Sequence, residues 1–128
     1  MSLGPSLDQR FLQSVFVAIE RRHRLKSMLL VNAHSLFDRI YQPERAARVA
    51  VVYEQREITY EELRAATVRA AEALHALGVR EGDRVALLLN DSPEFIASFV
   101  GVISIGAIAV PINMALRKDD QLFILKDC

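Results

Sequence analysis

Residues 59–111 constrain the fold of this 128-residue chain more than any other stretch. They alternate between helix-like and strand-like segments, and a capping or turn residue stands at each boundary. Thr59 and Glu62 have the spacing of a capping box, in which each residue's side chain bonds to the backbone N–H of the other. Gly78 supplies the left-handed conformation that commonly ends a helix. A helix over 60–77 is therefore predicted.

The predicted helix has one apolar face, made of Leu63, Ala66, Ala70, Leu74 and Leu77. Charged and polar residues, among them Arg64, Glu72 and His75, lie away from that face. Ile58 precedes the cap and can pack on the first leucine as a hydrophobic staple. Val79 can pack back on the helix from beyond its end. We therefore expect a helix that buries one side and is fixed at both ends.

A βαβ unit is predicted next. The unbroken apolar run at 85–89 is typical of a parallel strand covered on both faces. Ser92 and Pro93 have the pattern of a helix cap and first helical residue, and Gly106 ends the apolar, buried helix that they begin. A second strand is predicted over 107–110. A crossover of this length is right-handed, so the fold class is α/β, a short parallel sheet flanked by helices.

Two smaller elements are predicted around this unit. β-branched and apolar residues at 49–53, and again at Ile58, indicate a hairpin whose second strand is very short. Residues 117–127 have a helical pattern, with Leu122 and Leu125 expected to face inward.

The N-terminal part shows helical spacing over 7–27, with one apolar face and a basic end. Such a helix can dock on a membrane or a partner, but cations near a helix C-terminus also complement its dipole, and this interpretation is favoured. A short helix is expected to begin at Asn32 or Ser35. The expected division is an amphipathic helix with a leader left by cloning over 1–30, and a partial α/β subdomain over 31–128.

Composition limits the partners of the chain. Lys plus Arg and Asp plus Glu number 16 each, so no global field selects nucleic acid. A single cysteine excludes a disulfide framework and favours a reducing compartment, here the cytoplasm. The uncharged run at 95–116 is long enough to span a bilayer. A buried helix followed by a buried strand gives the same pattern, and we favour that interpretation.

No histidine, glycine or cysteine is assigned a functional role. The five glycines are too scattered to cradle a phosphate. His23, His34 and His75 have no companions at metal-ligand spacing. Cys128 lies at the end of the chain, with nothing in the sequence to activate its thiol.

The serines and the glutamate pair have structural interpretations too. No nucleophile elbow surrounds Ser92, Ser98 or Ser104. The first is interpreted as a helix cap and the others as small packing residues. Glu61 and Glu62 are adjacent on a helix and so point in different directions. The sequence therefore yields no catalytic, cofactor-binding or metal-binding residue.

Six short motifs carry a family resemblance, and they occur in order: ITYEEL at 58–63, LGV at 77–79, GDRVA at 82–86, NDSPEF at 90–95, GAIAVPIN at 106–113 and ILKD at 124–127. Together they resemble the N-terminal part of the AMP-forming adenylating enzymes. That superfamily contains acyl- and aryl-CoA synthetases, peptide-synthetase adenylation domains and beetle luciferases. The first and fifth motifs are similar to the family's first two core motifs.

The resemblance implies a two-step reaction in a parent enzyme. A carboxylate attacks the α-phosphate of ATP, giving an acyl-adenylate and pyrophosphate, and the CoA thiolate then displaces AMP; magnesium offsets the phosphate charge. Asn113 resembles acyl-CoA or aryl-CoA ligases, because peptide-synthetase domains commonly carry Asp there. The family's phosphate loop, its adenine and ribose motifs and its C-terminal domain have no matching positions. No catalytic residue is therefore carried over.

Two functions stay open. The first is an N-terminal fragment of an acyl-CoA or aryl-CoA synthetase, inactive alone, whose partner is the remainder of its own polypeptide. In that case 85–89 and 95–105 are expected to expose apolar surface and cause self-association. The second is a non-enzymatic α/β interaction module that uses the basic N-terminal helix. A downstream Ser/Thr/Gly-rich loop ending in Pro-Lys favours the first.

Overall fold

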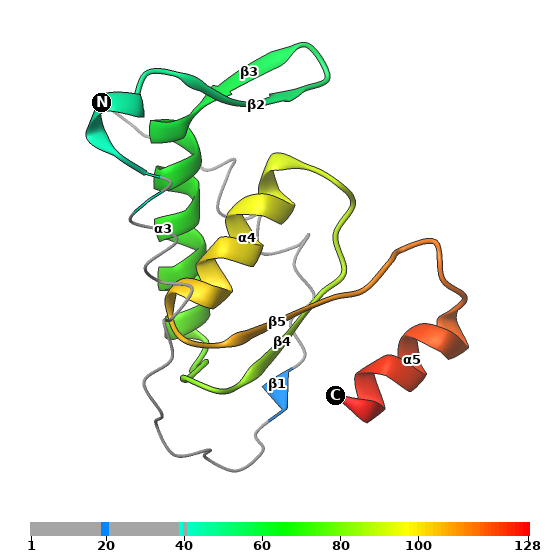
Figure 1. The fold of residues 1–128 in the computed structure, drawn as a ribbon. Coiled ribbons are helices and arrows are strands. Elements are labelled where there is room, and N and C mark those ends of the chain that lie inside the picture. The colour runs from blue at the N-terminus through cyan, green and yellow to red at the C-terminus, as the bar shows by residue number, and fades with distance from the viewer. Residues whose placement is uncertain (1–18, 21–38, 40) are drawn as a thin grey trace, which may run out of the picture.

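The computed structural model describes Ile19–Glu20, Arg39 and residues 41–128. The described elements follow in the order β1 (Ile19–Glu20), η1 (Pro43–Arg45), β2 (Val49–Tyr53), β3 (Arg56–Thr59), α3 (Tyr60–Ala76), β4 (Arg84–Leu87), α4 (Pro93–Ser104), β5 (Ile108–Pro111) and α5 (Lys118–Asp127). Figure 1 shows α3 and α4 side by side, with β4 and β5 crossing beneath them.

The predicted βαβ unit forms the centre of this arrangement. β4 and β5 pair in parallel from Arg84 opposite Ile108 to Leu87 opposite Pro111, and α4 connects them. β4 ends two residues earlier than predicted. The N–H of Ile112 bonds to the carbonyl of Leu87 at 3.0 Å, and the ladder ends there.

The N-terminal prediction is wrong at the two residues where it can be compared with the structure. β1 pairs antiparallel with β4, Glu20 opposite Arg84, where helical spacing had predicted helix. A free strand edge offers hydrogen bonds that local periodicity does not register. The rest of that helix lies outside the described residues, as does the short helix from Asn32 or Ser35 apart from Arg39.

α3 begins and ends with the predicted motifs. The backbone N–H of Thr59 donates to Oε2 of Glu62 at 2.8 Å, and the N–H of Glu62 donates to Oγ1 of Thr59 at 3.2 Å. Gly78 follows the helix with φ +88. The N–H of Val79 donates to the carbonyl of Leu74 at 3.1 Å, completing a Schellman motif.

The buried face of α3 differs from the predicted one at three positions: Thr67 is buried, Ala66 is only half-buried and Leu77 is exposed. Its buried residues are Leu63, Thr67, Ala70 and Leu74. Leu77 is 55% exposed, because the chain turns away from the helix there. Thr67 is fully buried because its hydroxyl donates to the carbonyl of Leu63 at 2.8 Å and so needs no water.

Gly101 sets the closest approach of α4 to α3. A Cβ added at this position would lie 3.0 Å from Cβ of Ala70 and 3.2 Å from the backbone N of Ala71 and the carbonyl of Thr67. Two of these neighbours are backbone atoms and cannot turn aside. The absence of a side chain therefore allows the two helices to pack at this distance.

The core lies in two clusters. The larger joins the end of α3 to the βαβ unit and consists of Leu74, Val79, Val85, Leu87, Val102 and Ala107. The smaller lies under the hairpin and contains Ile58, Leu63 and Ala97. The predicted staple partners are both in this second cluster, so the staple joins the hairpin to the helix pair.

The hairpin and α5 are present with differences from the predictions. β3 has four residues, more than the very short strand predicted, and the two-residue loop places Glu54 at φ 53. Leu122 was expected to face inward but is 50% exposed. Ile124 and Leu125 are the half-buried apolar residues of this helix. The actual inner face is therefore rotated from the predicted one.

The expectation that residues 85–89 and 95–105 are the segments with exposed apolar side chains is wrong. Val85, Ala86 and Leu87 are buried between neighbouring strands and α4, and the apolar residues of α4 are buried or half-buried against α3 and β5. The exposed large apolar side chains are instead Val49, Val52, Val68, Leu77, Ile108, Met114, Leu116, Leu122 and Phe123.

Candidate functional site at the carboxyl edge of the parallel strands

The parallel strands bring two loops to one edge of the sheet. Residues 88–92 follow β4 and residues 112–117 follow β5. In open α/β sheets, ligands bind outside the carboxyl ends of the strands. This edge is therefore the candidate binding region of the described chain.

Polar groups at this edge are engaged in local turns. Ser92 caps α4, as predicted, by accepting a hydrogen bond from the N–H of Phe95 at 3.2 Å. Oδ1 of Asn113 accepts from the N–H of Ala115 at 2.8 Å. Asn90 is exposed. Ser92 and Asn113 therefore shape the loops, whereas the exposed amide of Asn90 can contact a ligand but supplies no acid, base or nucleophile.

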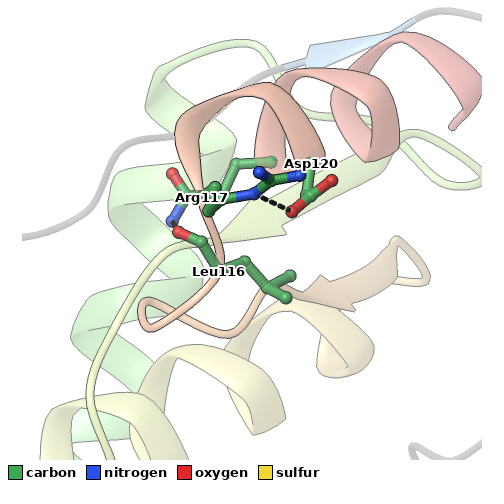
Figure 2. A network of polar contacts seen from close by, with 4 residues as sticks. Leu116, Arg117 and Asp120 are labelled. Atoms are coloured by element: carbon green, nitrogen blue, oxygen red, sulfur yellow. Dashed lines mark hydrogen bonds and ion pairs between the residues drawn. The ribbon is translucent and has the colours of Figure 1, made fainter.

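The second loop is attached to the first turn of α5. Nε2 of Gln121 donates to the carbonyls of Leu116 at 3.1 Å and Met114 at 3.4 Å. Figure 2 shows the neighbouring ion pair, in which Nε of Arg117 lies 3.4 Å from Oδ2 of Asp120. Because this pair is exposed, it contributes at most about 1 kcal/mol. The local turns and Gln121 therefore determine the shape of the loop.

Glu62 is engaged as a cap. The backbone N–H of Thr59, and then its hydroxyl, hold the pKa of the Glu62 carboxyl below its usual value. Glu61 is exposed beside it and takes no part in the capping box. The pair therefore does not form a joint acid–base site, in agreement with its predicted structural role.

The other candidates stand apart from one another. Oγ of Ser104 donates to the carbonyl of Gly101 at 2.8 Å. Ser98 is 2% exposed, and its Oγ has no hydrogen-bond partner among the described residues. His75 is exposed near the end of α3.

The remaining candidates do not form a cluster either. Cys128 is half-buried, and its N–H bonds to the carbonyl of Ile124. His23 and His34 lie outside the described residues. Within residues 19–20, 39 and 41–128, no group of three or more His, Cys, Asp or Glu side chains could hold a metal. The same residues contain no helix with the length and apolar character needed to cross a membrane.

Sequence reasoning missed the structural role of Asp83. Its side chain is 7% exposed, and Oδ2 accepts from the N–H of Arg80 at 2.8 Å. Its backbone carbonyl accepts from the N–H of Ile108 at 2.8 Å. One residue thus closes the turn before β4 and aligns the start of β5. An aspartate at the end of a glycine-containing turn was the available signal.

Comparison with known proteins gives the class to which this fold belongs. Residues 40–128 match the sequence profile of the AMP-binding enzyme family. The chain therefore belongs to the AMP-binding enzyme family, and its α/β fold is that of the N-terminal domain of adenylating enzymes. The recognition made from the six motifs is confirmed.

Three relatives illustrate the similarity. The chain is 46% identical over 80 residues to the 3-hydroxybenzoate–CoA/4-hydroxybenzoate–CoA ligase of Thauera aromatica, covering 62% of this chain and 15% of that protein. It is 47% identical over 70 residues to a long-chain-fatty-acid–CoA ligase of Mycobacterium tuberculosis, covering 55% and 14%. The solved anthranilate CoA ligase in complex with anthranoyl-AMP superposes with a TM-score of 0.72 at 38% identity, covering 80% of this chain and 20% of that one.

Proposed function

We propose that this chain is the N-terminal part of an ATP-dependent, AMP-forming acyl-CoA or aryl-CoA synthetase. The family match over 40–128 is the observation that carries the proposal. The chain spans 15% or less of the curated relatives described above. The reaction is therefore proposed for a longer protein of which these residues are a part.

In the proposed reaction a carboxylate oxygen bonds to the α-phosphorus of ATP and pyrophosphate leaves. The CoA thiolate then bonds to the acyl carbon and AMP leaves, so a thioester replaces the mixed anhydride. Magnesium, when bound, supplies charge neutralisation at the phosphates. ATP, magnesium and CoA enter as requirements of this reaction, and we assign none of the described residues to them. Asn113, which resembles CoA ligases at its position, supports CoA as the acceptor.

The proposed role of residues 1–128 is to build a scaffold. The βαβ unit presents its two carboxyl-end loops in a fixed relation, and the buried clusters attach that unit to the hairpin. We assign no catalytic group to either loop, so we expect this segment alone to be inactive. A single cysteine supports a reducing compartment, and we propose the cytoplasm.

Carboxylate-dependent exchange of labelled pyrophosphate into ATP tests the proposal. The 128-residue chain and the complete product of its gene are assayed with a panel of benzoate, hydroxybenzoates and medium- and long-chain fatty acids. We expect exchange with at least one acid for the complete product and none for the 128 residues. Exchange by the short chain, free of the longer one, contradicts the scaffold role. A complete product that stops at Cys128 and binds a partner chain instead supports the interaction module.

We also propose that the 128-residue chain self-associates, because large apolar side chains stay exposed on it. Val52 and Phe123 are 68% and 69% exposed, although many equally apolar residues of this chain are buried. Single exposed apolar residues are ordinary on protein surfaces, but neighbouring ones favour association.

A further inference from the structure

The loop that follows β5 begins on the sheet and closes into a single turn. Ile112 is 2% exposed, and its N–H bonds to the carbonyl of Leu87 at the end of β4. The N–H of Leu116 donates to the carbonyl of Asn113 at 3.2 Å, and the N–H of Ala115 donates to Oδ1 of the same asparagine at 2.8 Å. The loop therefore contains a turn in which an asparagine side chain reinforces the backbone bond.

Gln121 holds this turn from the side of α5. Its Nε2 donates to the carbonyl of Leu116 at 3.1 Å and to that of Met114 at 3.4 Å. An amide nitrogen carries two hydrogens, so one side chain can satisfy both carbonyls. The backbone N–H of Gln121 bonds to the carbonyl of Arg117 at 3.0 Å, so the residue itself belongs to the helix. Gln121 therefore joins the turn to α5 through bonds that neither the turn nor the helix makes by itself.

The neighbouring ion pair is a weaker link. Nε of Arg117 lies 3.4 Å from Oδ2 of Asp120, and Figure 2 shows this pair beside Leu116. Both side chains are largely in water, where such pairs contribute little. The pair also leaves the carbonyls of the turn untouched. The two hydrogen bonds of Gln121 are therefore the contacts that determine how the turn sits on α5.

We propose that Gln121 is a positioning residue for substrate binding in the parent synthetase, an inference that rests on the proposed function. The turn lies beyond the carboxyl end of β5, where open α/β sheets bind their ligands. A turn already held in one conformation loses less freedom when a ligand contacts it, so the ligand binds more tightly. Gln121 acts through the turn and is no catalytic residue. Its loss should therefore raise a KM and change kcat little.

Three substitutions of Gln121 in the complete product of the gene test this role, with the acid of the panel that supports the fastest pyrophosphate exchange. Gln121→Met keeps the length and helix propensity of the side chain but removes both donors, and Gln121→Glu sets acceptors against the carbonyls. Each should raise KM for at least one of ATP, the acid and CoA about tenfold, because two neutral hydrogen bonds are lost. Gln121→Lys restores a donor of similar reach and should stay within about threefold of wild type.

Hydrogen–deuterium exchange of the same proteins reports on the turn independently of activity. The N–H groups of Ala115 and Leu116 are bonded inside the turn. Peptides that contain them should exchange faster in Gln121→Met and Gln121→Glu, and at the wild-type rate in Gln121→Lys. Gln55→Met is the matched control, since it makes the same substitution at an exposed position of the hairpin loop. It should change neither deuterium exchange in the turn nor any KM.

The contrary results separate this inference from the proposed function. If the wild-type product is active and Gln121→Met leaves all three KM values unchanged, the positioning role is wrong, even where the turn exchanges deuterium faster. If Gln121→Lys fails to recover, the amide does not act as a hydrogen-bond donor and the inference is contradicted. A wild-type product that exchanges no pyrophosphate with any acid overturns the proposed function, and the substrate role of Gln121 with it. Deuterium exchange then still shows whether Gln121 holds the turn.

Discussion

Buried polar side chains of this chain have opposite effects on its stability, depending on whether they are hydrogen-bonded. Thr67 and Asp83 are buried with their side-chain oxygens bonded to the backbone. Ser98 is buried without a partner among the described residues. A satisfied buried group adds modestly to stability, whereas an unsatisfied one costs about 1–3 kcal/mol. All three side chains are polar, and only their neighbours in the fold distinguish them.

Ser98→Ala should therefore stabilise the fold. The substitution removes the unpaired hydroxyl and changes the volume little, so we expect the free energy of unfolding to rise by about 1 kcal/mol. Urea unfolding measures it. Ser104→Ala is the matched control, since it makes the same exchange in the same helix but loses a hydrogen bond of 2.8 Å to Gly101. The inference fails if Ser98→Ala is no more stable than Ser104→Ala.

Glu62 should make stability depend on pH. Its pKa is lowered from the usual 4.5 by the backbone N–H of Thr59 and then by its hydroxyl. The ionised Glu62 carboxylate thus stabilises the folded state fully above pH 4.5. This contribution is lost as the pH falls through the lower, folded-state pKa. We expect the stability difference between wild type and Glu62→Gln to shrink across that acid range, as followed by thermal unfolding. Glu61→Gln is the matched control, because Glu61 takes no part in the capping box; a parallel trend in both variants contradicts the assignment.

The elements of this chain are stabilised by one another more than by their own propensities. α3 and α4 cross where Gly101 meets Ala70 and the backbone of Thr67 and Ala71. In isolation, a glycine inside a helix costs about 1 kcal/mol relative to alanine. Here the close approach of the two helices outweighs that cost, because it buries the side chains around the crossing.

Gly101→Val should destabilise the molecule by about 2 kcal/mol or more, because a branched side chain cannot enter the crossing without moving α4 away from α3. Gly101→Ala should lie closer to wild type, since improved helix propensity offsets part of the strain. Chemical unfolding gives both values. Ala65→Val, at an exposed position of α3, is the control and should change stability by less than about 0.5 kcal/mol. Wild-type stability in Gly101→Val would show that the helices separate freely.

Element types and their caps were largely predictable, because their causes are local. The capping box, the glycine after α3 and the proline at the start of α4 act within a few residues. Inner faces were less predictable. Leu77 and Leu122 have the spacing of buried residues but are exposed, because burial depends on which neighbouring element is present.

For the whole molecule, strand order decides which backbone groups stay unpaired. Among the described strands, β5 lies at the edge of the sheet. The N–H of Ile108 bonds to Asp83, just before β4, and that of Ile112 bonds to Leu87 of β4, so by alternation the N–H positions at 109 and 111 point outward. Position 111 is a proline, which has no N–H, and edge prolines discourage pairing with other chains.

Pro111→Ala should therefore increase aggregation without unfolding the chain, because it adds an unpaired donor to the outer edge of β5. Thioflavin fluorescence during prolonged warm incubation should rise earlier than in wild type, and circular dichroism at the start should be unchanged. Pro93→Ala, in the first turn of α4, is the control for losing a proline away from the edge. Equal lag times for all three proteins would show that the edge is protected in another way.

The sequence alone determined the α/β class, the boundaries of the central helices, the family resemblance and the structural roles of Ser92 and the Glu61–Glu62 pair. These follow from motifs within one element, whose physics is short-range. Tertiary structure alone decided that Ile19–Glu20 form a strand on β4. It also decided that Thr67 and Asp83 are buried with hydrogen-bonded side chains, whereas Ser98 is buried without a partner among the described residues. Finally, it decided that Leu122 and Phe123 of α5 are exposed. The physical reason is that burial and pairing depend on residues far apart along the chain.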